Sequence, residues 1–386
     1  MLFAKLNDLS IGGKGAYGIA ASAVERKADL PTYLRITDIF DDGTLNLSEL
    51  KSVDAPNSDK YLLKPNDIVF ARTGGSTGRN YFYDGSDGVF VYAGFLIKFS
   101  IDPEKVNPKY VKYYCRSKQY NDWVQSFNTG STRGNINAQT FGNMEIPLPE
   151  RKQQDYLVSI LEPIDEKIKN NKQVNDNLQQ QAAALFSSLY DRTNTEVRFT
   201  DLIQILGGGT PKTGENTYWN GNIAFFTPKD VGTPYTLITE KTITEEGLSH
   251  CNSRLYPVNT VFVTARGTVG KVGMSGVPMA MNQSCYALVG KETHQFLVYF
   301  YTLKAVDRLK HKASGAVFDA ITTRDFESEQ IMKLSDDDAK AFLCIAEPMF
   351  QKVLNNCIEN LRLSTLRDSL LPKLMSGEVD VSAVQL

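Results

Sequence analysis

The sequence predicts an α+β protein in which one unit, a mixed α/β domain followed by a long helix, occurs twice. Three observations lead to this prediction. The 386 residues exceed the usual size of a single domain. Short motifs recur in the same order in both halves, and two long stretches carry apolar residues at helical spacing. We therefore expect two mixed α/β domains joined by two long antiparallel helices that form a coiled coil, with pseudo-two-fold symmetry.

The repeat appears at two sequence offsets. Pairs 192 positions apart are Asp38 and Asp230, Pro65 and Pro257, and Gly78 and Gly270. Pairs 185 positions apart are Ile136 and Ile321, Phe141 and Phe326, and Glu162 and Glu347. The change of offset reflects different loop lengths in the two copies. An ordered series of matches through both halves indicates an internal duplication.

Each copy divides into a domain and a helix. Residues 1–149 mix short β-branched and aromatic runs with Gly, Asn and Asp turns, which predicts strands and loops with one helix near 108–121. Residues 150–192 then change to a Gln-, Lys- and Leu-rich pattern typical of a long helix. The second domain is expected over 193–334, and the second long helix with a tail over 335–386.

The two predicted helices share a heptad seam. Alternating steps of four and three residues run from Leu157 to Leu189 and from Phe342 to Leu374. The middle of each seam holds a pair of asparagines, namely Asn171, Asn175, Asn356 and Asn360. Buried asparagine at a seam position costs stability but fixes register, so we expect these pairs to meet near the crossing point. The alternative is that each helix packs only on its own domain. Arg367 interrupts the second seam, and the sequence offers no reason for it.

The composition excludes several classes of protein. The 42 Lys and Arg against 44 Asp and Glu give a net charge of −2, so any polyanion must be met by cations gathered locally. The five cysteines form no CxxC pair, the first residues lack the apolar core of a signal peptide, and no apolar run reaches the ~18 residues of a membrane span. We expect a cytoplasmic protein. The GxGxxG pattern at 13–18 neither follows a clear strand nor opens a clear helix, and the histidines have no metal-ligand spacing, so we predict no catalytic and no metal site.

Four segments carry a resemblance to a known family. They are GGGTPKTGENTYWNGNIAFFTPKDVG at 207–232, VFVTARGTVGKVG at 261–273, IPLPERKQQDYLVSILEPIDEKI at 146–168 and LLPKLMSGEV at 370–379. With these motifs the chain resembles, over nearly its whole length, the specificity (S) subunits of type I restriction-modification systems. The first copy departs from the pattern, with ARTGGSTGR where the second has TARGTVGK.

The resemblance implies a non-catalytic subunit with two target recognition domains, each reading one half of a bipartite site in double-stranded DNA. The helices would act as a spacer and dock two modification (methyltransferase) subunits. S-adenosylmethionine, ATP and Mg²⁺ would be bound by those partners and by the restriction subunits, and no cofactor by this chain. Two alternatives remain open: a purely protein-protein scaffold, and a self-contained DNA-modifying enzyme with unfamiliar motifs. A helix over 151–190 would span at most ~60 Å, so the half-sites should lie about one turn of DNA or slightly more apart.

Two glycine-rich loops, 71–80 and 264–271, are the better candidates for the DNA surface. Glycine lets a backbone approach a ligand closely, Arg and Lys supply charge-assisted donors, and an Arg fork can bind guanine in the major groove. The candidates in these loops are Arg72, Thr73, Ser76, Thr77, Arg79, Arg266, Thr268 and Lys271. Three further candidates are Arg133, Asn135 and Lys229. The alternative is a glycine hairpin with incidental charges.

Two basic segments, 104–118 and 297–312, occupy the same place in their copies. Cations at helical spacing on one face suit phosphate contacts rather than base contacts. The candidates are Lys109, Lys112, Arg116, Lys304, Arg308 and Lys312. The alternative is a solvated helix face.

Overall fold

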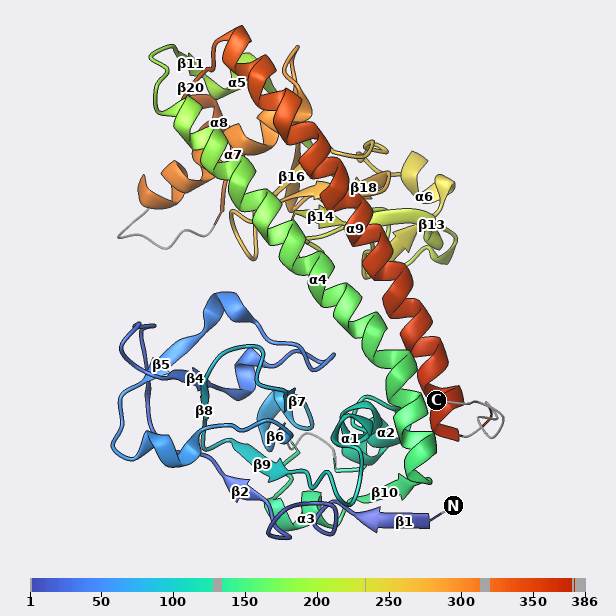
Figure 1. Ribbon diagram of the computed structural model, residues 1–386. Helices are drawn as coiled ribbons and strands as arrows, with labels where there is room; N and C mark the ends of the chain where they lie inside the picture. The colour runs from blue at the N-terminus through green and yellow to red at the C-terminus, as the bar shows by residue number, and fades with distance from the viewer. Residues whose placement is uncertain (1, 128–133, 233, 313–319, 377, 379–386) are drawn as a thin grey trace. The chain divides into compact units, whose positions relative to one another are not determined.

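The computed structural model describes residues 2–127, 134–232, 234–312, 320–376 and 378 (Figure 1). The chain divides into two compact units. Unit 1 holds residues 1–166 together with the end of the C-terminal helix from Ser364, and unit 2 holds Lys167–Leu363. Both long helices, α4 (Arg151–Tyr190) and α9 (Asp336–Ser376), contribute to both units. The two predicted long helices therefore form, over Arg151–Tyr190 and Asp336–Ser376, but neither belongs to a single unit.

Unit 1 contains two four-stranded sheets and a two-stranded antiparallel sheet. The first sheet is antiparallel, in the order β2 (Ala16–Tyr17), β9 (Leu96–Ser100), β6 (Asp67–Ala71) and β7 (Asn80–Tyr83). The second has the order β3 (Ala23–Val24), β5 (Lys51–Val53), β4 (Thr32–Leu34) and β8 (Phe90–Tyr92), with β4 and β8 parallel. Strands β1 (Leu2–Lys5) and β10 (Glu145–Leu148) pair antiparallel. All five residues of β6 are buried, as expected for a central strand covered on both faces.

The helices of unit 1 cover one face of its first sheet. They are α1 (Pro108–Tyr114), α2 (Lys118–Gln125), α3 (Ala138–Gly142) and the start of α4. Helix α1 begins where Asn107 accepts a hydrogen bond from the Lys109 backbone and Pro108 occupies the first turn, a position that proline favours. The core packs Phe70 and Phe99 of the sheet against these helices and against Leu371 of α9.

Unit 2 repeats this plan. Its larger sheet has the order β12 (Ile203–Gly207), β19 (Cys285–Gly290), β16 (Val261–Thr264), β17 (Val272–Ser275) and β14 (Tyr235–Thr236). Its smaller sheet has the order β15 (Lys241–Ile243), β13 (Trp219–Phe226) and β18 (Met279–Met281). Strands β11 (Glu196–Arg198) and β20 (Gln330–Met332) form a separate two-stranded antiparallel sheet. The helices are α5 (Phe199–Leu202), α6 (Glu245–Ser249), α7 (Gln295–Lys312), α8 (Thr323–Ser328) and the facing parts of α4 and α9.

The helix pair runs antiparallel within each unit. In unit 1, Asp165 of α4 bonds Arg367 of α9, and Leu157 and Leu161 share a core with Leu371. In unit 2, Lys167 of α4 pairs with Glu359 of α9, and the end of α4 shares a core with the start of α9. Residues later in α4 thus lie beside residues earlier in α9. The predicted seam residues are buried or half-buried. The predicted α+β class with two long antiparallel helices is therefore confirmed.

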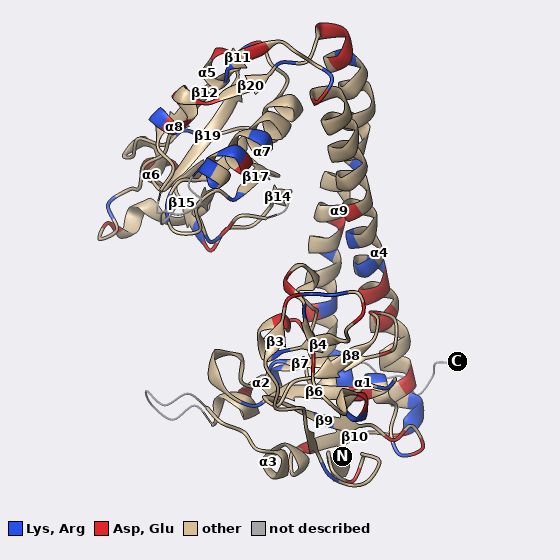
Figure 2. Cartoon of the chain, turned by 90° about the vertical axis from the view of Figure 1, so that its left-hand side faces the viewer, with Lys and Arg blue, Asp and Glu red and all other residues tan. Residues whose placement is uncertain are grey.

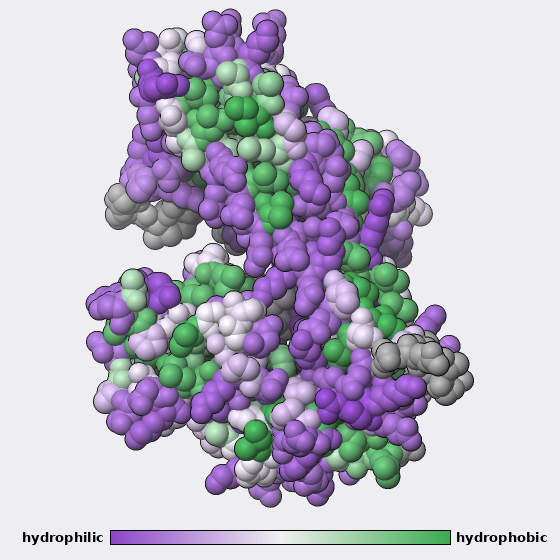
Figure 3. Space-filling view, in the orientation of Figure 1, coloured by the Kyte–Doolittle hydropathy of each residue, from purple (hydrophilic) through white to green (hydrophobic). Residues whose placement is uncertain are grey.

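No helix within the described residues has the length and apolar character needed to cross a membrane. The face shown in Figure 3 carries hydrophobic side chains in separate areas among hydrophilic ones.

Candidate DNA-binding surface

The strand order of unit 1 brings several chain segments to one edge of its first sheet. Because β2 and β6 both run antiparallel to β9, the carboxyl ends of β2 and β6 lie beside the amino end of β9. Tyr17, the loop 72–79 and Phe95 therefore meet at this edge, which we call the first recognition edge.

The larger sheet of unit 2 builds an equivalent edge. Strands β12 and β16 run antiparallel to β19, so Gly207, the loop 265–271 and Ser284 meet there. We call this the second recognition edge. Both glycine-rich loops predicted from the sequence thus lie at the same place in their domains.

Several residues of the first loop serve the loop itself. The Thr77 hydroxyl donates to the backbone oxygens of Gly74 and Gly134 at 2.8 and 2.9 Å. Arg79 donates to Asp41 at 2.6 Å and to the Ile39 carbonyl at 3.2 Å. These bonds hold Thr77 and the guanidinium of Arg79 against the domain, so we do not carry either residue into the proposed DNA surface.

The backbone of the first loop is fixed at Gly78, which adopts a left-handed conformation with φ +87°. Its carbonyl accepts a bond from the Tyr120 hydroxyl at 2.6 Å. Burial raises the pKa of Tyr120 well above its ordinary value, so this hydroxyl keeps its proton and remains a donor. A Cβ at Gly78 would lie 2.4 Å from the side chain of Val124. Glycine is therefore required here by conformation and by space.

The remaining first-loop candidates lie toward the surface. The Arg72 guanidinium lies over the rings of Tyr17 and Phe95, at 5.3 and 5.7 Å from their centroids. Thr73 pairs with Asn135 through a backbone bridge, and the side chain of Asn135 is exposed. Ser76 is half-buried. The candidate Arg133 lies outside the described residues. Tyr17 and Phe95 were not among the candidates predicted from the sequence, because they lie beside Arg72 only through the pairing of strands that are distant in the chain.

The second loop presents its candidates to solvent. Arg266, Thr268 and Lys271 are all exposed. The loop is closed by the Thr264 hydroxyl, which accepts from the Lys271 backbone at 2.9 Å and donates to the Thr268 carbonyl. The Thr268 hydroxyl lies 3.3 Å from the Pro228 carbonyl, which places Lys229 next to the loop. Lys229 itself makes an exposed ion pair with Glu240 at 3.5 Å. Such a pair contributes little, so Lys229 remains accessible to an anion.

A further cation stands at the second loop. A Cβ on Gly270 would lie 2.6 Å from Cε of Lys310, so the Lys310 stem runs along this glycine. Lys310 is exposed, and among the described residues no carboxylate pairs with Lys310, Arg266 or Lys271. Lys310 lies on the side of α7 opposite to the face of Lys304, Arg308 and Lys312, which the helical spacing had favoured.

The candidate cations of α1 turn inward, toward the start of α4. Lys109 pairs with Glu162, and both Lys112 and Arg116 pair with Asp165, at 3.2 and 2.8 Å. Lys112 and Arg116 keep only 18% and 15% of their side-chain exposure. The expectation that these three residues contact phosphates is therefore replaced by a structural role, because carboxylates of α4 already neutralise them.

Asp165 is the centre of this cluster and explains Arg367. Arg367 reaches it from α9 at 3.0 Å, and the Tyr113 hydroxyl donates to it at 3.1 Å. Burial alone would raise the pKa of Asp165, but Arg116, Lys112 and Arg367 outweigh it and hold that pKa well below its usual range. Burial, with Arg116 nearby, lowers the pKa of Lys112. Arg367, which interrupts the apolar seam, thus serves as an ion-pair partner of a half-buried carboxylate.

The candidate cations of α7 are also engaged within their domain. Lys304 lies over the Tyr190 ring at 5.3 Å, Arg308 donates to the Gln330 carbonyl at 2.8 Å, and Lys312 pairs with the buried carboxylate of Glu329. Figure 2 shows Lys and Arg gathered along α7. We therefore expect Lys310 to be the cation of α7 that contacts DNA, in place of Lys304, Arg308 and Lys312.

The predicted asparagines meet across the helix pair of unit 2. Asn171 Nδ2 donates to Asn360 at 2.9 Å, and Asn356 Nδ2 donates to Asn175 at 2.8 Å. Asn171, Asn175 and Asn356 are buried. The contact is as predicted, and their role in fixing register remains a prediction.

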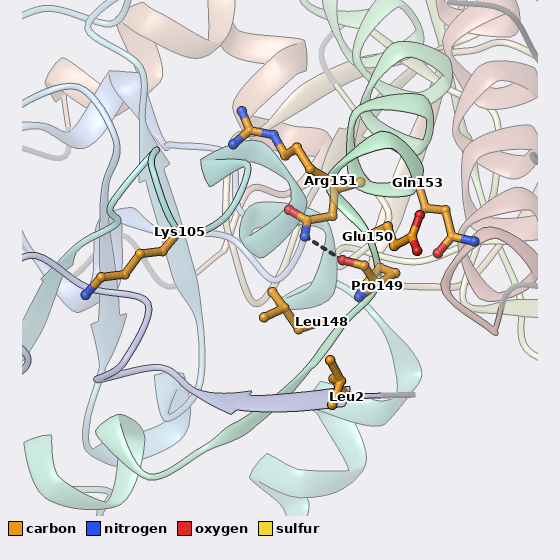
Figure 4. Close-up of a pocket in the computed structure, with 8 residues that line it drawn as sticks. Leu2, Lys105, Leu148, Pro149, Glu150, Arg151 and Gln153 are labelled. Carbon is orange, nitrogen blue, oxygen red and sulfur yellow. Dashed lines mark hydrogen bonds between the residues drawn. The ribbon is translucent and has the colours of Figure 1, made fainter.

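A hollow in unit 1 lies away from the recognition edge, at the start of α4. Figure 4 shows Leu2, Leu148 and Arg151 around it. Gln154 donates to the Pro149 carbonyl at 2.8 Å, and Arg151 pairs with Asp155, so the polar groups here hold the turn into α4. We assign this hollow no function.

The profile described as "Type I restriction modification DNA specificity domain" matches twice, over residues 25–180 and 192–333. The chain belongs to this family. The two matches agree with the duplication read from the sequence, and each of them includes one of the two glycine-rich loops.

Relatives of this specificity family match over most of their length. The HindI type I restriction enzyme specificity subunit of Haemophilus influenzae is 22% identical over 92% of this chain and 97% of that protein. The MjaIX specificity subunit of Methanocaldococcus jannaschii is also 22% identical, over 73% of this chain and 71% of that protein. The crystal structure of an S subunit of a type I restriction-modification system from M. genitalium has a TM-score of 0.58 at 16% identity, covering 97% of this chain and 95% of that chain. The structural match supports the fold.

Proposed function

We propose that this protein is the non-catalytic DNA-specificity subunit of a type I restriction-modification complex. Each mixed α/β domain reads one half of a bipartite site in double-stranded DNA through its recognition edge. The observation that supports this most directly is the double match to the specificity family, with a glycine-rich loop and an arginine at the same edge of both domains.

The partners follow from the same proposal. The helix pair sets the spacing of the half-sites and docks two modification subunits, and restriction subunits join that assembly in the cytoplasm. This chain binds no cofactor. S-adenosylmethionine, ATP and Mg²⁺ act in the partners, which carry out adenine methylation and cleavage.

The binding test uses the complex reconstituted with its modification subunits and a salt series. DNA binding should weaken steeply with salt, and each lost phosphate contact should reduce the slope of log K against log salt by about 0.9. We expect this for Arg266→Ala, Lys271→Ala and Lys310→Ala. Lys291→Ala is the matched control, because this exposed lysine follows the far end of β19. Salt-independent binding, or equal slopes for all four variants, would contradict the proposed surface.

Activity separates the alternatives. The purified chain alone, given S-adenosylmethionine or Mg²⁺, should leave DNA unmodified, whereas the complex should methylate it. Modification by the chain alone would favour a self-contained enzyme. A complex that binds no DNA at any salt concentration would favour a protein-protein scaffold.

A further inference from the structure

The two recognition edges carry different chemistry at equivalent positions. Backbone pairing defines the equivalence: Tyr17 faces Ile97 as Gly207 faces Tyr286, and Ile97 and Tyr286 also face the matching central strands at Phe70 and Val263. Tyr17 therefore corresponds to Gly207.

The same argument places two more residues. The Arg72 amide donates to the Phe95 carbonyl at 3.1 Å, and the Ala265 amide donates to the Ser284 carbonyl at 2.8 Å. Arg72 thus corresponds to Ala265, and Phe95 to Ser284. Three large side chains of the first edge stand where the second edge has Gly, Ala and Ser.

Those three large side chains form one cluster. The Arg72 guanidinium is held over two aromatic rings, and each ring remains solvent-accessible, with Tyr17 exposed to 44% and Phe95 to 55%. Both rings flank one guanidinium and leave part of their surface exposed, while the Tyr17 hydroxyl accepts a bond from the Ala138 amide at 3.1 Å. Stacking on aromatic rings also fixes the plane of a guanidinium.

Within the described residues, the Arg72 guanidinium donates no hydrogen bond. Arg72 Nε is buried without a hydrogen-bond partner, and among the described residues no side chain or carbonyl accepts a bond from this guanidinium. The other arginine of the loop, Arg79, is by contrast paired with Asp41. Because Nε is enclosed, the donors that an acceptor from outside the chain can reach are the Nη groups, which are not enclosed.

We propose that Tyr17, Arg72 and Phe95 form the base-reading site of the first domain, and that its ligand is a guanine in the major groove. This inference rests on the proposed function. A planar guanidinium presents two parallel donors that match guanine O6 and N7. The flanking rings supply apolar contact suited to base edges. A phosphate is the weaker fit, because the one other arginine of this loop is already neutralised.

The second domain reads its half-site differently. Its edge lacks the cluster, and its exposed cations Arg266, Lys271 and Lys310 surround small residues. Its affinity therefore depends more on salt, whereas the first domain depends on one base.

The test starts with the unaltered complex and duplexes of its recognised site. Each guanine is replaced in turn by 7-deazaguanine, which removes N7, and by inosine, which keeps O6 and N7 and is the matched control. One guanine of one half-site should show at least ~5-fold weaker binding with 7-deazaguanine and no change with inosine. If neither half-site contains a guanine with this dependence, the inference fails.

Two variants then assign that guanine to the cluster. Arg72→Lys keeps the charge but loses the fork, and should relax discrimination at that base by roughly 5- to 150-fold and abolish its 7-deazaguanine effect. Phe95→Ala should weaken discrimination at the same base, and Phe95→Tyr should restore it. Arg79→Lys, in the same loop but paired with Asp41, is the control and should leave discrimination at this base unchanged.

Other results would overturn the inference. A uniform loss of affinity over all sequences would make Arg72 a phosphate contact. Unchanged discrimination with a lowered unfolding midpoint would make the cluster structural, and unchanged discrimination with an unchanged midpoint would leave the cluster no role in base reading. An unaltered complex that shows no sequence-selective binding would instead refute the proposed function.

Discussion

Replacing Asp165 by Asn removes the charge that holds three cations together in unit 1. The carboxylate accepts from Arg116 at 2.8 Å and from Arg367 at 3.0 Å, and Lys112 lies at 3.2 Å. Asn keeps the shape but leaves the three cations facing one another. Loss of one partner from a buried ion pair costs roughly 3–5 kcal/mol. Because Asp165 keeps 15% of its side-chain exposure, we expect about 3 kcal/mol, or ~6–12 °C in the melting temperature of a unit of this size.

A double-mutant cycle measures the coupling within the cluster. Arg367→Met alone should cost less than Asp165→Asn, because Lys112 and Arg116 still neutralise the carboxylate. In the Asp165→Asn background, Arg367→Met should be neutral or stabilising, since it relieves repulsion between cations. Asp122→Asn is the control: its ion pair with Lys118 is exposed and should contribute less than ~1 kcal/mol. Unfolding by urea, followed in the complex and in the isolated chain, gives these values. Strictly additive effects would refute the account of Arg367.

The same cluster predicts a pH dependence. The pKa of Asp165 is lower in the folded protein than the ~3.9 of an unfolded Asp. A lowered folded pKa gives stability that is fully present above ~4 and is lost as the pH falls below it. The stability difference between the unaltered protein and Asp165→Asn should therefore shrink below pH ~4, and a constant difference down to pH 2 would contradict this.

Three further perturbations test the loops and the helices. Gly78→Ala should destabilise unit 1 by roughly 2–4 kcal/mol, because its Cβ would meet the buried Val124 at positive φ. Gly270→Ala has a positive φ as well, but its shortest contact is with the flexible end of Lys310, so it should cost less, about 1–2 kcal/mol. Equal losses of stability in the two variants would refute this. Changing all four seam asparagines to Leu should raise stability but loosen register. We expect a disulfide between cysteines placed at the facing positions 167 and 359 to form in lower yield in that variant, and an unchanged yield with unchanged activity would exclude the register role. Deleting one heptad from both helices at matched positions should shorten the unspecified gap of the recognised sequence by about three base pairs, and an active variant with an unchanged gap would refute the spacer reading.

Some features of this protein were determined by the sequence alone. Duplication, the long helices and the asparagine pairs depend on spacing along the chain, and spacing is visible in one dimension. The same holds for the glycine-rich loops, because residues such as Gly78 are required by the local backbone.

The tertiary structure decided which side chains are available. Cations in basic segments that look alike in sequence have different partners. Lys112 and Arg116 pair with a carboxylate of α4, whereas Lys310 lies beside the second loop. The cluster joins residues that are distant in sequence: Arg72 follows Tyr17 by 55 positions and precedes Phe95 by 23. They meet only through the pairing of β2, β9 and β6. Whether a charged side chain is paired inside the fold or free to bind a ligand depends on residues far away in sequence, because Coulomb and stacking energies depend on distance in space.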